Sequence, residues 1–261
     1  MRALYTAATG MNAQQIRTDA IANNIANSST VGFKKSRAEF QDLFYETLRA
    51  PGAESSTGTV VPAGIQVGHG VQLSAVSRVH ATGDKSASGR DLDFAIEGDG
   101  FFQVEKGTGE TVYTRAGNFQ LDRDGNLVTA DGFQLIPNIQ IPVDAVQVTV
   151  LSDGTVSVLE SGSTSPNDVG QIELARFANP AGLRAIGGNL FVPSESSGDA
   201  ETGAPDEDGF GAVSQGFLEG SNVNVSEELV KLILAQRGFE MNSRVLQAGD
   251  EMMQRLGALS R

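Results

Sequence analysis

Four carboxylate side chains stand close together in the sequence: Asp91, Asp93, Glu97 and Asp99. Two carboxylates that face one cleft are the groups that hydrolyse a glycosidic bond, so this segment could serve an enzyme that acts on glycans. The apolar side chains between them alternate as in a strand, which predicts that most of the carboxylates point to solvent. A secreted wall-acting enzyme with helical tails is still an alternative function. Hydrolysis of peptidoglycan that is lost in Asp93→Asn would support it.

Metal-binding and catalytic patterns are weak elsewhere in the chain. Residues 122–126 resemble half of a calcium loop, but the two later positions that need Gly and Glu hold Leu127 and Phe133. The only histidines, His69 and His80, stand in or beside strand patterns, and there is no cysteine. No phosphate-binding loop, zinc-protease motif or nucleophile elbow occurs. We therefore expect no catalytic residue, no bound metal and no cofactor.

Charge and turn-forming residues divide the 261-residue chain into three parts. The net charge of −13 consists of +2 in residues 1–50, −15 in residues 51–220 and zero in residues 221–261. All eight prolines and 26 of the 31 glycines lie in the middle part. An acidic surface repels the phosphate backbone of nucleic acids, so we expect no nucleic-acid partner. The ends and the middle must therefore form different kinds of structure.

Both ends of the chain predict long helices. Residues 3–27 lack proline and place apolar side chains on one stripe, whereas residues 226–259 repeat apolar side chains at steps of three and four, with Ser226 as the expected N-cap. The C-terminal segment has two apolar lines: Val230, Leu234, Met241, Val245, Ala248, Met252, Leu256 and Leu259, and Leu229, Leu232, Phe239, Leu246 and Met253. Such a helix packs either on its own domain core or in a coiled coil with more than one partner.

The middle of the chain predicts antiparallel β structure. Short alternating runs occur at 65–75, 92–96, 119–127 and 146–158. Asp124-Gly125 and Asp153-Gly154 separate such runs, as in β-hairpins. Residues 50–64 and 196–211 predict extended or flexible loops, and the second is expected to be a solvated surface loop because it holds five acidic residues and no basic one. The fold class is therefore α+β, with an inserted β-rich domain between helical ends.

Two segments near the chain ends resemble a known family. The run IANNIANSSTVGFKK at 21–35 resembles the N-terminal signature of the flagellar rod and hook axial proteins, and LEGSNVNVSEE at 218–228 resembles their C-terminal signature. Further runs resemble the members that build the distal rod: residues 1–11, 38–43, 92–104 and 113–119. The resemblance is close over both ends and 92–135, and only generic over 136–205.

The resemblance implies an architecture and a function. The terminal helices would pair as an antiparallel coiled coil that lines a hollow tube, and the β domain would face outward. The implied parts are an N-terminal helix and assembly motif (1–45), an extended inter-subunit stretch (46–75), a β-rich outer domain (76–220) and a C-terminal helix (221–261). The chain would be a structural subunit of the distal rod, a helical polymer that transmits torque to the hook. A proximal rod or hook subunit is the alternative within the family.

The resemblance also implies location, partners and assembly residues. The subunit would leave the cytoplasm through the flagellar type III export apparatus, without a cleaved signal peptide, and join the basal-body rod in the periplasm. Its partners would be itself, proximal rod proteins, hook or hook-side subunits, and the ring bushing of the outer membrane and peptidoglycan. The expected assembly residues are Asn23, Asn24, Asn27, Gly32, Phe33, Lys34, Ser221, Asn222, Val223, Asn224, Leu229, Leu234, Met241, Val245 and Met252. The asparagines would hydrogen-bond across subunits, or Asn27 would form a local cap.

Overall fold

The computed structural model describes residues 2–51, 54–56, 59–60, 63–107, 109–162 and 165–259. The chain divides into two compact units, each built from separate stretches of sequence. The helix-and-ribbon unit consists of Met1–Ala26, Ser36–Ser77 and Asn224–Arg261, and the β unit consists of Asn27–Lys35 and Arg78–Val223. The α+β class expected from the sequence is confirmed.

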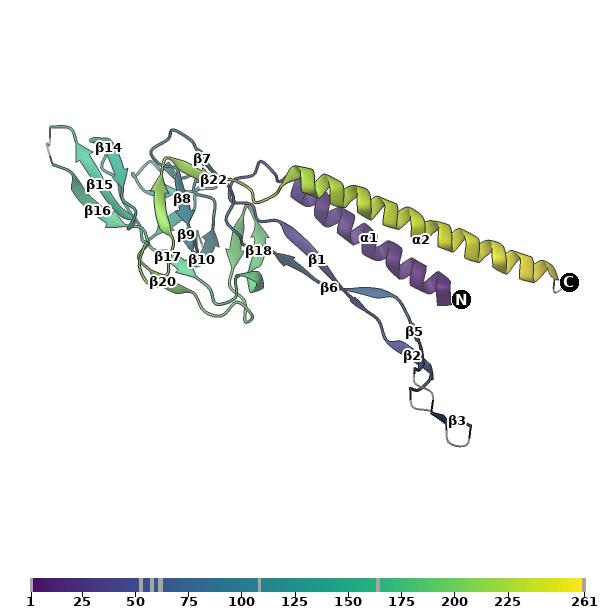
Figure 1. The fold of residues 1–261 in the computed structure, drawn as a ribbon. Coiled ribbons are helices and arrows are strands. Elements are labelled where there is room, and N and C mark those ends of the chain that lie inside the picture. Colours follow the sequence, from purple (N-terminus) through teal and green to yellow (C-terminus); the bar gives the residue numbers. More distant parts are fainter. Residues whose placement is uncertain are drawn as a thin grey trace. The chain divides into compact units, whose positions relative to one another are not determined.

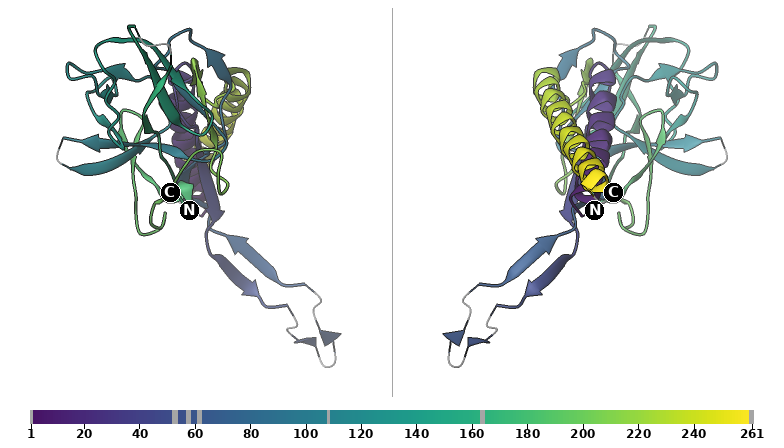
Figure 2. Two further views of the ribbon diagram at one scale, coloured as in Figure 1. Left: turned by 90° about the vertical axis from the view of Figure 1, so that its left-hand side faces the viewer. Right: turned by 90° about the vertical axis from the view of Figure 1, so that its right-hand side faces the viewer.

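The helix-and-ribbon unit contains both long helices, α1 (Arg2–Ala26) and α2 (Val225–Leu259). They lie side by side and run in opposite directions (Figures 1 and 2). Leu4, near the start of α1, lies beside Gly249, near the end of α2, whereas Asn24, near the end of α1, binds Glu228 in the first turn of α2. Glycine permits this close approach, because a Cβ at Gly249 would overlap the Leu4 side chain. None of the described helices is long and apolar enough to span a membrane.

The two apolar lines of α2 face different surroundings. Leu232 and Leu246 of the second line are half-buried, on the same side as the buried Ala235 and Gly249. The other members of that line are 41–46 % exposed, namely Leu229, Phe239 and Met253. The first line points to solvent, with exposed fractions between 47 and 64 % at Val230, Leu234, Met241, Val245 and Met252. The sequence left open whether α2 packs on the core of its own chain. For the first apolar line that interpretation is wrong, because these side chains are exposed.

The N-cap of α2 is Asn224 and not Ser226, which corrects the sequence-based prediction. The Asn224 side-chain oxygen accepts a hydrogen bond from the Glu227 backbone N–H at 3.2 Å, and helix α2 already begins at Val225. Asparagine, like serine, has a side-chain oxygen that can satisfy a free N–H of the first turn. The sequence offered both residues, and the hydrogen bond distinguishes them.

The helix-and-ribbon unit also contains a two-stranded ribbon, which extends away from the helices (Figure 1). Strand β1 (Ser36–Asp42) pairs with β6 (Val71–Arg78), β2 (Tyr45–Arg49) pairs with β5 (Ile65–Gly68), and β3 (Glu54–Ser56) pairs with β4 (Thr59–Val60). The loop expected over 50–64 is therefore wrong for β3 and β4, while residues 52–53, 57–58 and 61–62 of that stretch lie outside the described residues.

The run expected as one strand at 65–75 is two strands, interrupted at Gly70. Gly70 has a φ of +116° and lies against α1, where a Cβ would overlap the Thr9 hydroxyl. Thr9 Oγ1 also accepts a hydrogen bond from the Val71 N–H at 3.4 Å. The approach of the ribbon to α1 therefore breaks the strand, and no pattern of apolar residues reports such an approach.

The β unit is built on one antiparallel sheet of nine strands, which differ in length. Its main path runs in the order β11-β12-β13-β9-β10-β19-β18, and β17 adds to β9 and carries β20 on its other side. The strands of this sheet are β9 (Phe101–Lys106), β10 (Glu110–Thr114), β11 (Gln120–Leu121), β12 (Leu127–Val128), β13 (Gln134–Ile136), β17 (Leu174–Arg176), β18 (Arg184–Gly187), β19 (Leu190–Val192) and β20 (Glu201–Gly203).

Smaller sheets and one short helix complete the β unit. A three-stranded sheet has the order β14-β15-β16, and two pairs, β21 with β8 and β22 with β7, bring distant segments together. These elements are β7 (Lys85–Ala87), β8 (Phe94–Glu97), β14 (Ala145–Val150), β15 (Thr155–Glu160), β16 (Asn167–Gln171), β21 (Ala212–Gln215), β22 (Phe217–Glu219) and the 3-10 helix η1 (Pro180–Gly182). The main core includes Phe94, Phe102, Phe119, Val156 and Leu174.

Both hairpins expected from Asp-Gly pairs are confirmed. Strands β11 and β12 pair around Gly125, and β14 and β15 pair around Gly154, with φ values of +84° and +81° at the two glycines. The sequence predicts that Val146, Val148 and Val150 lie on one face of β14, but Val146 is 69 % exposed and does not share the burial of Val150. A β-bulge between Ala145 and Gln147 shifts the register there.

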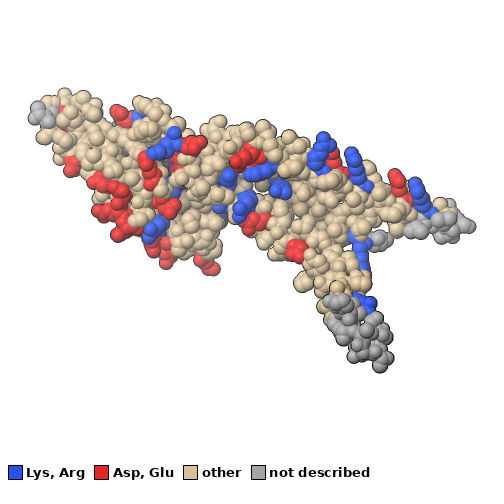
Figure 3. All heavy atoms as spheres, viewed as in Figure 1, with Lys and Arg blue, Asp and Glu red and all other residues tan. Residues whose placement is uncertain are grey.

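The acidic stretch 196–211 is more ordered than the flexible loop expected from its composition. Part of it forms β20, which pairs with β17. The Arg176 guanidinium binds the Glu201 carboxylate at 2.9 Å and the Asp208 backbone oxygen at 3.1 Å. The acidic side chains themselves are exposed, as expected, and on the face seen in Figure 3 acidic residues gather over the β unit. Backbone pairing and one cation thus fix a segment whose side chains stay in water.

Candidate functional site

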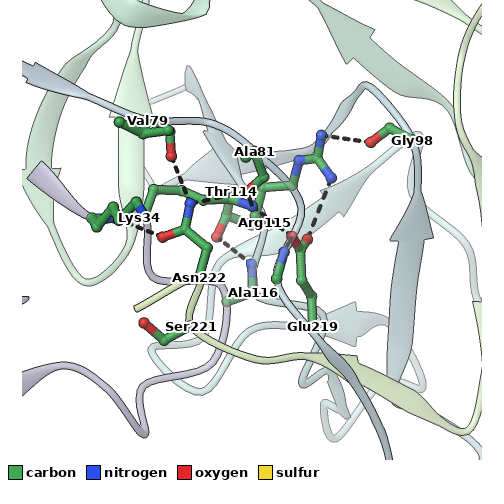
Figure 4. A network of polar contacts seen from close by, with 12 residues as sticks. Lys34, Val79, Ala81, Gly98, Thr114, Arg115, Ala116, Glu219, Ser221 and Asn222 are labelled. Carbon is green, nitrogen blue, oxygen red and sulfur yellow. Dashed lines mark hydrogen bonds and ion pairs between the residues drawn. The ribbon is translucent and has the colours of Figure 1, made fainter. Parts of the chain in front are cut away.

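A buried ionic cluster joins the two signature segments within the β unit (Figure 4). The Lys34 Nζ lies 2.5 Å from Glu219 Oε1, and the Arg115 Nη1 lies 3.3 Å from Glu219 Oε2. The exposed fractions of the three side chains are only 0, 1 and 2 % for Lys34, Glu219 and Arg115. One carboxylate therefore holds two cations that are both shielded from water.

Backbone groups complete the coordination of this cluster. Lys34 Nζ also donates to the Ala81 oxygen at 2.8 Å, and Arg115 Nη2 donates to the Gly98 oxygen at 2.8 Å. The Gly83 N–H donates to Glu219 Oε1 at 2.9 Å. Buried charges are tolerated when they are both paired and hydrogen-bonded. All three charges here are paired and hydrogen-bonded, although the Arg115 Nε has no hydrogen-bond partner among the described residues.

Asn222 acts as a second bridge beside the ionic cluster. Its Oδ1 accepts from the Lys35 N–H at 2.8 Å, and its Nδ2 donates to the oxygens of Val79 and Ala81 at 2.8 and 3.0 Å. The Gly32 N–H donates to the Glu219 backbone oxygen at 2.8 Å. The segments at 32–35 and 219–222, far apart in sequence, are therefore held together by side-chain and backbone bonds.

Burial dominates the electrostatics of the cluster. It lowers the pKa of Lys34, against the opposing attraction of Glu219, and it lowers the pKa of Arg115 in the same way. The neighbouring His80 has a pKa of about 4, first because it is partly buried and then because Lys34, Arg115 and Arg78 repel a further positive charge. His80 is therefore a neutral imidazole at neutral pH.

A second polar cluster lies in the helix-and-ribbon unit and centres on Asn24. Its Nδ2 donates to the Ser36 oxygen at 2.9 Å and to Glu228 Oε2 at 3.1 Å, and its Oδ1 accepts from the Ser36 N–H at 2.8 Å. Glu228 in turn binds Lys231 at 2.6 Å. The amide of Asn24 thus ties α1, the first ribbon strand and the first turn of α2, and its hydrogen bonds are made within its own chain.

Gly32 stands at a turn that only glycine can form without strain. Its φ is +69°, and a Cβ at this position would lie 2.6 Å from the backbone nitrogen of Ala116. The next residue, Phe33, is buried. This close approach places Lys34 where it meets Glu219.

The expected assembly residues separate into an inner and an outer group. Asn24, Gly32, Phe33 and Lys34 are buried, while Asn27 and residues 221–223 are half-buried. The outer group is exposed and consists of Asn23, Asn224, Leu229, Leu234, Met241, Val245 and Met252. The structure brings the inner group together around the two polar clusters and leaves the outer group on the surface, mostly along α2. A role of either group in contacts between subunits stays a prediction.

Sequence reasoning missed Arg115, His80, Glu219 and Glu228 as members of these clusters. Glu219 and Glu228 lie inside the C-terminal signature run at 218–228, and their place in that run could have identified them as candidates. Arg115 stands inside the family-like run 113–119, which was a signal for it, whereas nothing in the local sequence of His80 marks it. Both are separated from their partners by long stretches of chain.

The four carboxylates at 91–99 do not have the properties of a hydrolytic pair. Asp93 is buried, 3.9 Å from Arg90 Nη1, whereas Asp91, Glu97 and Asp99 are exposed. Hydrogen bonds from Lys85 and Ser214 lower the pKa of Glu97, whereas a general acid needs a raised pKa. In the part of the chain that the structure describes, no group of three or more His, Cys, Asp or Glu side chains could hold a metal ion.

Comparisons with known proteins agree with the division into end segments and a β-rich middle. Residues 4–34 match the flagella basal body rod protein family, residues 95–158 match the flagellar hook protein FlgE/F/G D1 domain, and residues 214–259 match the flagellar basal body rod FlgEFG protein C-terminal region. These three matches cover the signature segments, most of both helices and part of the β unit.

Full-length relatives are similar to this chain from end to end. The flagellar basal-body rod protein FlgG of Caulobacter vibrioides is 48 % identical over 97 % of both chains, and that of Borreliella burgdorferi is 46 % identical over 97 % of this chain and 96 % of its own. The protein of the same name from Bacillus subtilis is 43 % identical over the full length of both.

Proposed function

Because this chain belongs to the flagellar basal-body rod protein family, we propose that it is a structural subunit of the distal rod. In this role it polymerises helically into a hollow, rigid shaft that transmits torque to the hook, and it carries out no reaction. The basal body is its location, and the rod that it builds spans the periplasm.

The observation that carries this proposal is the distribution of exposed apolar side chains. Seventeen of the twenty-three large apolar side chains exposed on the described surface belong to the helix-and-ribbon unit, which is the smaller unit. Burying one such side chain stabilises an interface by about 1.5–3 kcal/mol, so the stripe on α2 alone favours strong association. A patch of this kind on a soluble chain indicates a protein-binding surface.

We infer that neighbouring copies cover the α2 stripe. Helices α1 and α2 would pair as an antiparallel coiled coil in each subunit, and the outward line of Val230, Leu234, Met241, Val245 and Met252 would pack on the helices of other copies. Contacts between two different surfaces of the same chain generate a ring when the rotation between copies closes and a helical filament when it does not, and the proposed rod is the second case.

The ribbon is proposed to brace neighbouring copies. A two-stranded ribbon is only marginally stable in water by itself, and this one exposes Phe44 to 90 % together with Leu48 and Ile65. Contact with other subunits would bury these side chains and stiffen the shaft. The β unit, with its acidic surface, would remain on the outside of the tube.

The remaining partners follow from the family and complete the proposal. They are proximal rod proteins, hook or hook-side subunits, the ring bushing in the outer membrane and peptidoglycan, and the flagellar export apparatus. Export would occur without a cleaved signal peptide. Cysteine is absent from the sequence, which suits passage of an unfolded chain into an oxidising compartment.

Electron microscopy of the purified chain at high concentration tests the proposal. We expect straight tubes from the unchanged protein and none from Leu234→Glu, because a charge in the α2 stripe opposes its burial. Gln247→Glu is the matched control, since it adds the same charge at an exposed polar position of the same helix. The proposal fails if Leu234→Glu assembles like the unchanged protein. Tubes that curve and bend easily would favour the hook alternative.

A further inference from the structure

A small cavity in the β unit lies next to the buried ionic cluster. It has a volume of about 200 Å³. Its polar wall consists of His80, Asp99, Arg115 and Arg176, and its apolar wall includes Phe101, Phe177 and Pro180. The aromatic walls are fixed by edge-to-face packing, with the Phe101 and Phe177 ring centres 5.8 Å apart. The cavity is therefore a rigid, partly apolar space with basic groups on one side.

Three buried polar atoms of the cavity residues have no hydrogen-bond partner among the residues that the structure describes. They are Arg115 Nε and the two ring nitrogens of His80. Arg115 is 98 % buried, and its other guanidinium nitrogens bind Glu219 and Gly98. Neutral His80 carries one N–H, so the residues around the cavity hold two unused donors. Buried donors are nearly always paired, and an acceptor in the cavity would satisfy them.

The charge around the cavity is positive in a part of the chain that is strongly acidic. Residues 51–220 hold only eight basic side chains, and three of them, Arg78, Arg115 and Arg176, surround His80 or line the cavity. Lys34 adds a fourth cation. The carboxylates nearby are Glu219, which is shared by Lys34 and Arg115, Glu201, which binds Arg176, and the exposed Asp99. These four cations outnumber the three carboxylates by one. The excess cation is Arg78, which lies near His80 outside the lining of the cavity, and its charge favours an anion beside His80.

We propose that this cavity binds a carboxylate group. A carboxylate accepts hydrogen bonds only, which matches the unused donors of Arg115 and His80, and Arg176 adds positive charge to the lining of the cavity. The volume suits the end of one acidic side chain or a molecule of the size of acetate. The carboxylate comes either from an acidic side chain of a second copy, a source that rests on the proposed function, or from a small free carboxylate.

Side-chain NMR of His80 in the monomer tests the binding itself. The chain has only two histidines, so His80 is assigned with a His69→Gln variant, and in the unchanged protein His69 serves as the internal reference. At about pH 6.5 and constant ionic strength, sodium acetate should move the His80 signals in a saturable way, and sodium chloride should not. His69 signals should stay in place. Unmoved His80 signals, or equal shifts with chloride, would overturn the proposal.

A matched pair of variants tests the site of binding. Arg176→Gln should weaken the apparent acetate affinity at least threefold, because it removes a cation from the cavity wall. Arg184→Gln removes the same charge from an exposed position on β18 outside the cavity and should leave the affinity unchanged. Equal effects of the two variants would show that acetate responds to overall charge, and the proposal would be wrong.

Solid-state NMR of assembled tubes identifies the source of the carboxylate. If a neighbouring copy supplies it, His80 in acetate-free tubes should give the signals of the acetate-bound monomer. If His80 keeps the signals of the free monomer and still responds to acetate, the ligand is a free carboxylate. Failure of the chain to form tubes would count against the proposed function alone, because the monomer titration does not need assembly.

Discussion

Glu219 is the residue on which the inner polar cluster depends. Its two carboxylate oxygens serve Lys34, Arg115 and the Gly83 N–H, and no other carboxylate within the described residues reaches the two cations. A buried ion pair adds little stability over apolar packing, but removal of one partner leaves charges that water cannot reach. The cluster is therefore a requirement of the fold more than a source of extra stability.

We expect Glu219→Gln to destabilise the chain by about 3–5 kcal/mol, since Lys34 and Arg115 would keep their charges without an opposite partner. Urea unfolding followed by circular dichroism measures the change. Glu173→Gln, at an exposed position of the same unit, removes an equal charge and should change stability by less than about 0.5 kcal/mol. A loss below about 1 kcal/mol in Glu219→Gln would contradict this account.

The neutral state of His80 makes stability depend on pH. Its pKa is about 4 in the folded chain and about 6.5 when exposed, so between these values the unfolded chain binds a proton that the folded chain does not. Stability contributed by this group is therefore complete above about pH 6.5 and falls as the pH drops towards 4. From about pH 7.5 to about pH 5 the loss amounts to about 2 kcal/mol.

Comparison with His80→Gln isolates this contribution. The variant has no group that titrates at this position, so its urea stability should lose about 2 kcal/mol less than that of the unchanged protein over the same pH change. His69→Gln is the control and should follow the unchanged protein. Parallel pH profiles of the unchanged protein and His80→Gln would refute the assignment.

At the scale of elements, helix α2 has one end fixed by side chains and one face left open. Asn224 caps its first turn, and Glu227 and Glu228 place negative charge at the positive end of the helix. Glu228 also accepts the hydrogen bond of Asn24 and so joins the capped turn to α1. The start of α2 is therefore set within the chain, while its first apolar line stays exposed to solvent in the part of the chain that the structure describes.

Replacement of the two candidate caps should give different results. Asn224→Ala removes the side-chain oxygen that accepts the Glu227 N–H and should cost about 1 kcal/mol of stability. Ser226→Ala lies inside the helix, where alanine is favoured, and should be neutral or slightly stabilising. Thermal unfolding of the two variants measures the difference, and a larger loss in Ser226→Ala would restore the sequence-based assignment.

At the scale of the whole molecule, the β unit contains residues that lie next to the helices in the sequence. Residues 27–35, which follow α1, and the end of 78–223, which precedes α2, both belong to it. Lys34 and Glu219 join these pieces inside the unit. We therefore expect the β unit to fold without the two helices.

This division predicts the behaviour of shortened chains. A chain of residues 27–223 keeps Lys34, Glu219 and both apolar cores of the β unit, so we expect a cooperative urea transition and no tube formation. A chain of residues 36–218 lacks both members of the ion pair and leaves Arg115 buried without Glu219, so its transition should shift to clearly lower urea concentration. Equal stability of the two chains would show that the cluster does not hold the unit together.

The sequence by itself determined the kinds of element and their order. Apolar steps of three and four, Asp-Gly turns and the confinement of proline to the middle are local properties, and they sufficed for the two helices and the hairpins β11–β12 and β14–β15. The family followed from the resemblance of the signature segments at 21–35 and 218–228. The paired strands β3 and β4 were missed, because their composition is that of a loop and pairing depends on a partner strand.

Only the tertiary structure decided which side chains meet. Glu219 binds Lys34 across 185 residues of sequence and Arg115 across 104, and the break at Gly70 comes from contact with α1. The half-burial of Leu232 and Leu246 and the exposure of the first apolar line of α2 follow in the same way from the position of α1. Local patterns specify periodicity, but burial and ion pairing arise between segments that are distant in sequence, so their outcome is fixed only when the chain has folded.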